Sequence, residues 1–160
     1  LLQKGADKIS INSAAVRNPQ LITDLAKQFG SQCVVIAIDV KFEDNEWFVY
    51  LNGGRIKTEL RALDWAKQAV ELGAGEILLT TMNHGGAEVG FAGDITREIS
   101  EAVSVPVIAS GGAGNMQHFL DAFEQGKADA ALAASVFHYK EIEISTLKKF
   151  LAENGVDMRF

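Results

Sequence analysis

Short apolar runs alternate with amphipathic stretches along the chain, and glycine, asparagine or proline residues separate them. The apolar runs are rich in β-branched residues, which fits buried parallel strands. We expect five such strands, at residues 8–12, 33–38, 76–80, 107–110 and around Leu132. The stretches between them have apolar residues at helical spacing and predict helices over 19–29, 60–72, 94–103, 116–125 and 145–154. This alternation predicts a parallel sheet in an α/β fold.

One segment departs from the alternation. Residues 42–50 carry a run of aromatic and apolar side chains around Asn45 and are followed by Asn52-Gly53-Gly54. Such a pattern predicts a β-hairpin inserted between the second strand and its helix. It leaves Asp39 at the C-terminal end of the strand over 33–38. Asp39 is therefore a candidate for general acid–base work, and a helix cap or a hairpin anchor is the alternative.

An internal repeat bears on whether the sheet is open or closed into a barrel. Asp7 and Ser13 flank the first strand as Asp129 and Ser135 flank the last, and each pair is offset by 122 residues. That offset covers about four βα units of ~30 residues each. A duplication of four units favours an eightfold barrel, and chance similarity of alanine-rich strands is the alternative. We predict a single domain over residues 1–160, as a partial (β/α)8 TIM barrel of about five units.

Glycines follow the strand at 107–110. Without Cβ atoms, Gly111-Gly112-Ala113-Gly114 can turn sharply and point backbone N–H groups at one anion, and the helix expected from Met116 adds its dipole. A phosphate is the natural ligand of such a loop. The alternative is a tight turn between strand and helix with no ligand.

Composition narrows the partners. The chain has 160 residues, 48% of them hydrophobic, and a net charge of −6 without a basic cluster, which argues against nucleic acid and anionic membranes. Cys33 stands alone in an apolar run and predicts a buried structural thiol in a reduced, cytoplasmic setting. Residues 1–4 resemble a helix end closed by Gly5, so we expect the sequence to begin within a longer protein.

Five motifs in order carry a family resemblance. They are listed here in chain order: Gly5 to Ala15, Ala37-Ile38-Asp39, Gly73 to Thr80, Ala109 to Gly114, and Ala131 to His138. In these motifs the chain resembles the cyclase subunits of imidazole glycerol phosphate synthase, from histidine biosynthesis. The resemblance implies the C-terminal three-fifths of a (β/α)8 barrel, strands four to eight, with the first three strands missing.

The resemblance also implies a reaction. The family's cyclase takes ammonia from a glutaminase (amidotransferase) partner and a ribulosyl-formimino-carboxamide ribotide with a phosphate at each end. It forms imidazole glycerol phosphate and an aminoimidazole carboxamide ribotide, without a cofactor. Asp39 would be one of two catalytic carboxylates. The second lies on the family's first strand, so we expect this fragment alone to be inactive.

Further site residues follow from the same resemblance. Asn12 and Ser13 would hold one phosphate. The residues that would hold the other are Gly85, Gly86, Ser110, Gly111, Gly112, Ala134 and Ser135. Lys8 and Glu76, at the opposite ends of their strands, would belong to an ammonia gate on the barrel floor, where the glutaminase docks. Their alternative role is a buried ion pair that holds the barrel closed.

The chain departs from the family at two positions. Gly85 and Ala92 stand where the family usually has aspartates, and we expect Asp94 to serve as a helix cap instead. His84 is expected to be a solvated loop residue rather than a proton donor. His118 and His138 lack metal-ligand spacing, and we expect no metal. Two alternatives to the cyclase stay open. One is a phosphate-binding barrel piece without catalysis, because Gly85 and Ala92 replace acidic residues. The other is a related sugar-phosphate isomerase.

Overall fold

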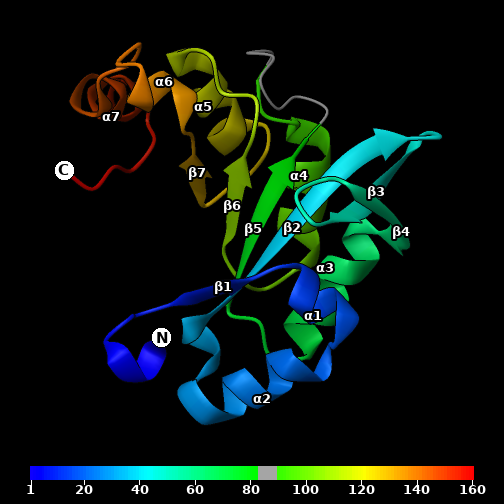
Figure 1. Cartoon of the computed structure of the whole chain (residues 1–160). Helices are drawn as coiled ribbons and strands as arrows, with labels where there is room; N and C mark the ends of the chain where they lie inside the picture. The colour runs from blue at the N-terminus through cyan, green and yellow to red at the C-terminus, as the bar shows by residue number, and fades with distance from the viewer. Residues whose placement is uncertain (83–89) are drawn as a thin grey trace.

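The computed structural model describes residues 1–82 and 90–160. Five parallel strands form the centre of its sheet (Figure 1). They are β1 (Ile9–Ile11), β2 (Val34–Glu43), β5 (Glu76–Thr81), β6 (Val107–Ser110) and β7 (Ala130–Leu132). Each pairs with the next in chain order, from β1 to β7. The predicted α/β fold with a parallel sheet is confirmed.

The strand order distinguishes the two parallel architectures. A doubly wound sheet reverses its order at a switch point, whereas a barrel adds every strand on the same side of the last. The order here never reverses, which is the order of a barrel. Within the described residues the sheet does not close, because β1 pairs with β2 alone and β7 with β6 alone. Four βα steps lead from β1 to β7, in agreement with the repeat.

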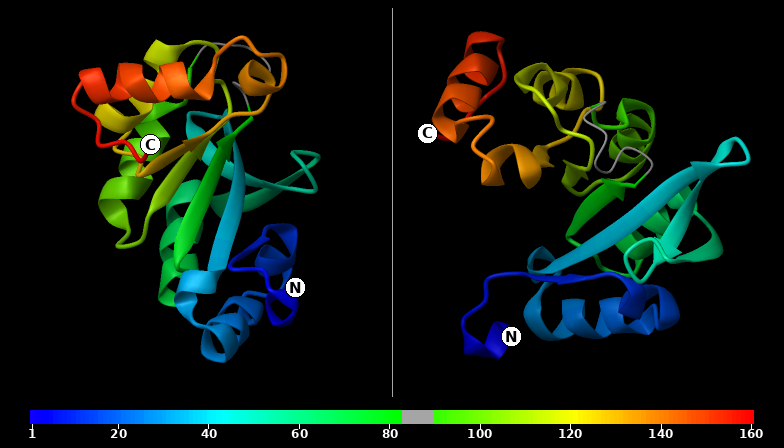
Figure 2. Two further views of the ribbon diagram at one scale, coloured as in Figure 1. Left: turned by 90° about the vertical axis from the view of Figure 1, so that its left-hand side faces the viewer. Right: turned by 45° about the horizontal axis from the view of Figure 1, so that its top comes forward.

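Helices of ten or nine residues follow the strands, as the amphipathic stretches predicted. They are α2 (Gln20–Phe29), α3 (Ala62–Glu71), α4 (Gly93–Ala102), α5 (Met116–Glu124) and α7 (Ile144–Glu153). Short pieces complete the chain: η1 (Leu2–Lys4), α1 (Ser13–Arg17), η2 (Ser31–Cys33) and α6 (Ser135–His138). The helices α1 and α2 lie at one end of the sheet and α5, α6 and α7 at the other, with α3 and α4 packed side by side between them (Figure 2). In the described ranges no helix is long and apolar enough to cross a membrane.

The predicted hairpin is present and larger than expected. β2 continues beyond the parallel sheet and pairs antiparallel with β3 (Glu46–Leu51), which pairs with β4 (Ile56–Arg61). Asp44 and Asn45 form the two-residue turn, both with positive φ (53° and 62°), as tight hairpins with the right twist require. The strand expected to end at Ile38 therefore runs on to Glu43, because the hairpin supplies new backbone partners there.

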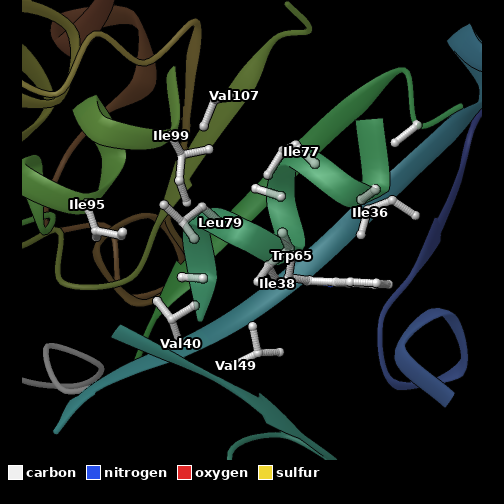
Figure 3. Packing of buried hydrophobic residues seen from close by; sticks show 14 of the residues in the cluster. Ile36, Ile38, Val40, Val49, Trp65, Ile77, Leu79, Ile95, Ile99 and Val107 are labelled. Carbon is white, nitrogen blue, oxygen red and sulfur yellow. The ribbon is translucent and has the colours of Figure 1, made fainter. Parts of the chain in front are cut away.

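The main core lies between the sheet and the helices (Figure 3). Alternate residues of the central strands point into it, among them Ile36, Ile38, Val40, Ile77, Leu79 and Val107. Trp65 from α3 and Ile95 and Ile99 from α4 fill the space opposite them. Because side chains alternate along a strand, the residues between these face the other side of the sheet. That second face is the one that a closed barrel would enclose.

Three local expectations were wrong in detail. Cys33 lies in the turn η2 before β2 and is half-buried, so it is not a core residue of the strand. The helix expected from residue 19 begins at Gln20, with Pro19 as its N-cap and no side chain capping it. Asp94 does not cap α4 either: the helix begins at Gly93 after Ala92, and Asp94 stands exposed in its first turn. There its carboxylate faces the positive end of the helix dipole.

Candidate functional site

A row of four residues crosses the C-terminal edge of the parallel sheet. The strand register pairs Asp39 with Thr80, Thr80 with Ser110, and Ser110 with Leu132. Residues paired across strands point to the same face. Their chain neighbours Ile38 and Leu79 belong to the main core, so this row faces away from the helices.

The structure thus places Asp39 and Ser110 on one face of one edge. Ser110 is buried, and Asp39 and Thr80 are half-buried. Sequence reasoning missed Thr80 as a member of this row. The signal was present, since Thr80 ends its apolar run as Asp39 and Ser110 end theirs.

Asp39 is the acidic group of the row. Burial raises the pKa of its carboxyl group above the ordinary value of 3.8, and a hydrogen bond from the Asn12 side chain opposes that rise. Asn12 follows β1 directly, so a residue expected to bind phosphate also contacts the expected catalytic carboxylate. The Asn12 Oδ1 atom is buried and accepts no hydrogen bond from the residues that the structure describes.

Ser13 follows Asn12 and is the first residue of α1. Its Oγ accepts a hydrogen bond of 3.0 Å from the Asn52 backbone N–H, in the turn after β3. Arg17 Nη2 donates to Asn52 Oδ1 at 2.9 Å. These two contacts join the hairpin to the end of β1, and the sequence analysis did not foresee them because the partners are 35 to 39 residues apart.

The glycine loop follows β6 at the same edge. Gly111 and Gly112 have φ values of 94° and 95°, and neither donates its N–H to another described residue. The Gly112 carbonyl accepts the Gly90 N–H at 2.9 Å, which fixes the loop on its outer side. Among the described residues, these two successive N–H groups therefore have no acceptor; that they bind an anion stays a prediction.

Gly114 does not contribute to that set. Its N–H donates to His118 Nδ1 at 3.1 Å, and Asn115 caps α5 by accepting the His118 N–H at 3.1 Å. His118 therefore holds the end of the loop against the first turn of α5. Sequence reasoning had considered this histidine only as a metal ligand.

Ala134 and Ser135 follow β7, which pairs with β6. Ser135 begins α6 as Ser13 begins α1, so the two serines of the repeat occupy equivalent places after the last and the first parallel strands. Both Ala134 and Ser135 are exposed.

Lys8 and Glu76 form an ion pair at the opposite edge of the sheet, across β2. The Lys8 side chain is 52% exposed and that of Glu76 14%. The alternative expectation of an ion pair is confirmed, but the pair is only partly buried.

Gly85 and Gly86, with His84, lie outside the described residues. Ala92 is described and is buried at the start of α4, where its carbonyl oxygen accepts the Thr96 hydroxyl at 2.7 Å. Within residues 1–82 and 90–160, no cluster of three histidine, cysteine or acidic residues could hold a metal ion.

Comparison with known proteins identifies the family. A family model described as "Histidine biosynthesis protein" matches residues 1–143. The chain belongs to this histidine biosynthesis family. The match takes in all five parallel strands and the site built on them.

Curated relatives share a name. The chain is 62% identical to "Imidazole glycerol phosphate synthase subunit HisF" of Flavobacterium johnsoniae over 159 residues, which cover 99% of this chain and 63% of that protein. The proteins of the same name from Geobacillus thermodenitrificans and Bacteroides fragilis are 59% and 58% identical, with 99% of this chain and 64% of each relative covered. The chain thus spans a little under two thirds of the length of these relatives.

Proposed function

We propose that this chain is part of a cyclase subunit of imidazole glycerol phosphate synthase and supplies strands four to eight of its barrel. The observation that carries the proposal is the arrangement around Asp39. A half-buried carboxyl group with a hydrogen bond to Asn12 stands between two groups of phosphate-binding candidates, on a single edge of the sheet. The kinship with subunits of that name supports the same reading.

Asp39 would move protons. Burial raises the pKa of its carboxyl group, which makes the carboxylate a stronger proton acceptor. The Asn12 amide would hold the carboxylate in place and favour its charged form. A second carboxylate, from a strand that this chain does not contain, would complete the acid–base pair.

The two phosphate groups would bind on either side of Asp39. Asn12 and Ser13 stand after β1, next to β2, whereas Gly111-Gly112 and Ala134-Ser135 stand after β6 and β7. At about 4.8 Å between strands, three to four strand spacings separate the groups by at most roughly 14–19 Å. That span suits one long metabolite with a phosphate at each end. Gly85 and Gly86 are included in the second group from the family resemblance.

The opposite edge would receive ammonia. We propose that a separate glutaminase subunit docks at the N-terminal ends of the strands, where Lys8 and Glu76 pair. No cofactor is required by this chemistry. We place the reaction in the cytoplasm, as the lone, unpaired cysteine suggests.

Ammonia-dependent turnover of the full-length protein tests the proposal. The missing N-terminal strands would be restored, and product formation followed from the diphosphorylated substrate. Asp39→Asn should lower kcat by at least about 100-fold, because it removes the proton carrier. Equal activity of this variant would rule out the role of Asp39.

A second candidate function is phosphate binding without catalysis. It is favoured by Ala92, which places a buried methyl group where the family usually has a carboxylate. Calorimetry with a phosphate-bearing substrate analogue separates the two candidates. Binding without turnover in the completed barrel would favour this second function.

A further inference from the structure

We propose that Arg17 and Asn52 are positioning residues for the phosphate group at Ser13, and that the turn Asn52–Gly54 acts as a strap over this end of the sheet. This inference rests on the proposed function. It names residues outside the strand ends, and a part of the hairpin, as determinants of substrate binding.

The strap is anchored on three strands. Asn52 contacts Ser13 and Arg17 beyond β1, and the Gly54 carbonyl accepts a hydrogen bond of 2.9 Å from Lys41 Nζ on β2. Gly54 also packs on the Met82 side chain at the end of β5, so closely that a Cβ would lie 2.5 Å from its sulfur. The turn therefore crosses β2 just beyond Asp39 and reaches the ends of both neighbouring strands.

The backbone of the turn suits this close approach. Asn52, Gly53 and Gly54 all have positive φ, of 53°, 65° and 81°. Asparagine and glycine are the residues that adopt this conformation at least cost. Such a succession directs the Asn52 N–H toward Ser13 and the Gly54 carbonyl toward Lys41.

The contact with Asn52 sets the role of the Ser13 hydroxyl. A serine hydroxyl has one hydrogen to donate and two lone pairs that accept. The Asn52 N–H occupies a lone pair, and the hydroxyl donates to no other described residue. Its hydrogen is thereby left for an acceptor such as a phosphate oxygen.

Arg17 adds charge and holds the strap. Its guanidinium donates to Asn52 Oδ1, and the Asn52 N–H donates to Ser13 Oγ. These two hydrogen bonds hold the cation beside Ser13. An arginine held in this way attracts a phosphate dianion. Losing it should weaken substrate binding and leave the chemical step at Asp39 unchanged.

Asn52→Gly is the sharpest variant. Glycine keeps the positive φ and the backbone N–H to Ser13, and it removes the side chain whose Oδ1 accepts from Arg17. In the full-length protein we expect KM for the diphosphorylated substrate to rise about tenfold with kcat within twofold, as for the loss of one hydrogen bond linked to a charged group. Arg17→Met should raise KM by the same factor. The double variant of Asn52→Gly and Arg17→Met should raise KM no further. Arg17→Lys should recover part of the affinity.

Lys27→Met is the matched control, since Lys27 is a cation in the last turn of the neighbouring helix α2 and has no hydrogen bond or ion pair with Ser13 or Asn52. It should leave KM unchanged. An unchanged KM in Asn52→Gly would overturn the positioning role. So would a fall in kcat as large as the rise in KM.

Binding of inorganic phosphate, measured by calorimetry on the same full-length proteins, keeps the two proposals apart. If the wild type shows no turnover, the proposed cyclase fails, and the strap is judged on this binding alone. Weaker binding by Asn52→Gly and Arg17→Met than by Lys27→Met would support it. Equal phosphate binding by the wild type and all three variants would refute the role of the strap, and so would a wild type that binds no phosphate.

Discussion

Gly111 lies against the backbone carbonyl oxygen of Thr81, and a Cβ built at position 111 would come within 2.5 Å of that oxygen. Gly111 also has a φ of 94°. The residue thus meets both conditions that exclude any side chain. This contact fixes the glycine loop after β6 against the end of β5.

We therefore expect Gly111→Ala to destabilise the fold by about 2–4 kcal/mol, as the sum of the left-handed backbone cost and overpacking against a rigid carbonyl. Urea unfolding would measure it. Gly93→Ala is the control, because a Cβ there meets no atom within 4 Å and position 93 is helical. A similar effect of the two substitutions would contradict the steric argument.

His118 should stabilise the glycine loop, because its ring nitrogen Nδ1 accepts the Gly114 N–H. His118→Phe keeps a ring against Gly90 but cannot accept the Gly114 N–H, and we expect a loss of about 1 kcal/mol in unfolding free energy. His118→Asn places an amide oxygen near the position of Nδ1 and should recover most of that loss. Thermal and urea unfolding of the three proteins check this. If His118→Asn recovers none of the lost unfolding free energy, the hydrogen bond is not its cause and the packing of the ring is.

Asp39 should make stability depend on pH. Its native pKa is raised above 3.8 by burial, so the unfolded chain ionises first as the pH rises. The wild type should lose stability relative to Asp39→Asn from about pH 4 up to the native pKa of Asp39, and the difference should then stay constant. Urea unfolding at pH 3.5 and pH 7 measures it. A wild type that gains stability relative to Asp39→Asn as the pH rises would contradict the assigned direction.

The Lys8–Glu76 pair should contribute little to stability. Because Lys8 is half-exposed, a double-mutant cycle should give a coupling energy below about 1 kcal/mol. Lys8→Met should cost more than Glu76→Gln, since it leaves the less exposed carboxylate without a partner. A coupling of 3 kcal/mol or more, as breaking a fully buried pair gives, would contradict this.

Much of the fold could be predicted from local patterns. The four long amphipathic helices between residues 20 and 124 and the five parallel strands were found because their periodicities are strong. β4 was missed, since none of the six residues of Ile56–Arg61 is buried: four are exposed and two half-buried, so no buried apolar face marks the strand. α1 was missed because five residues carry too little periodicity to mark a helix.

The sequence by itself determined which residue types stand at the strand ends: a carboxylate at position 39, small residues at 110–114 and 134–135, and serines at 13 and 135. These are local properties, set by backbone freedom and side-chain chemistry. Only the tertiary structure decided which of them meet. The strand register aligned Asp39 with Ser110, and the hairpin brought Asn52 to Ser13, because hydrogen bonds between segments far apart in sequence depend on how the whole sheet pairs.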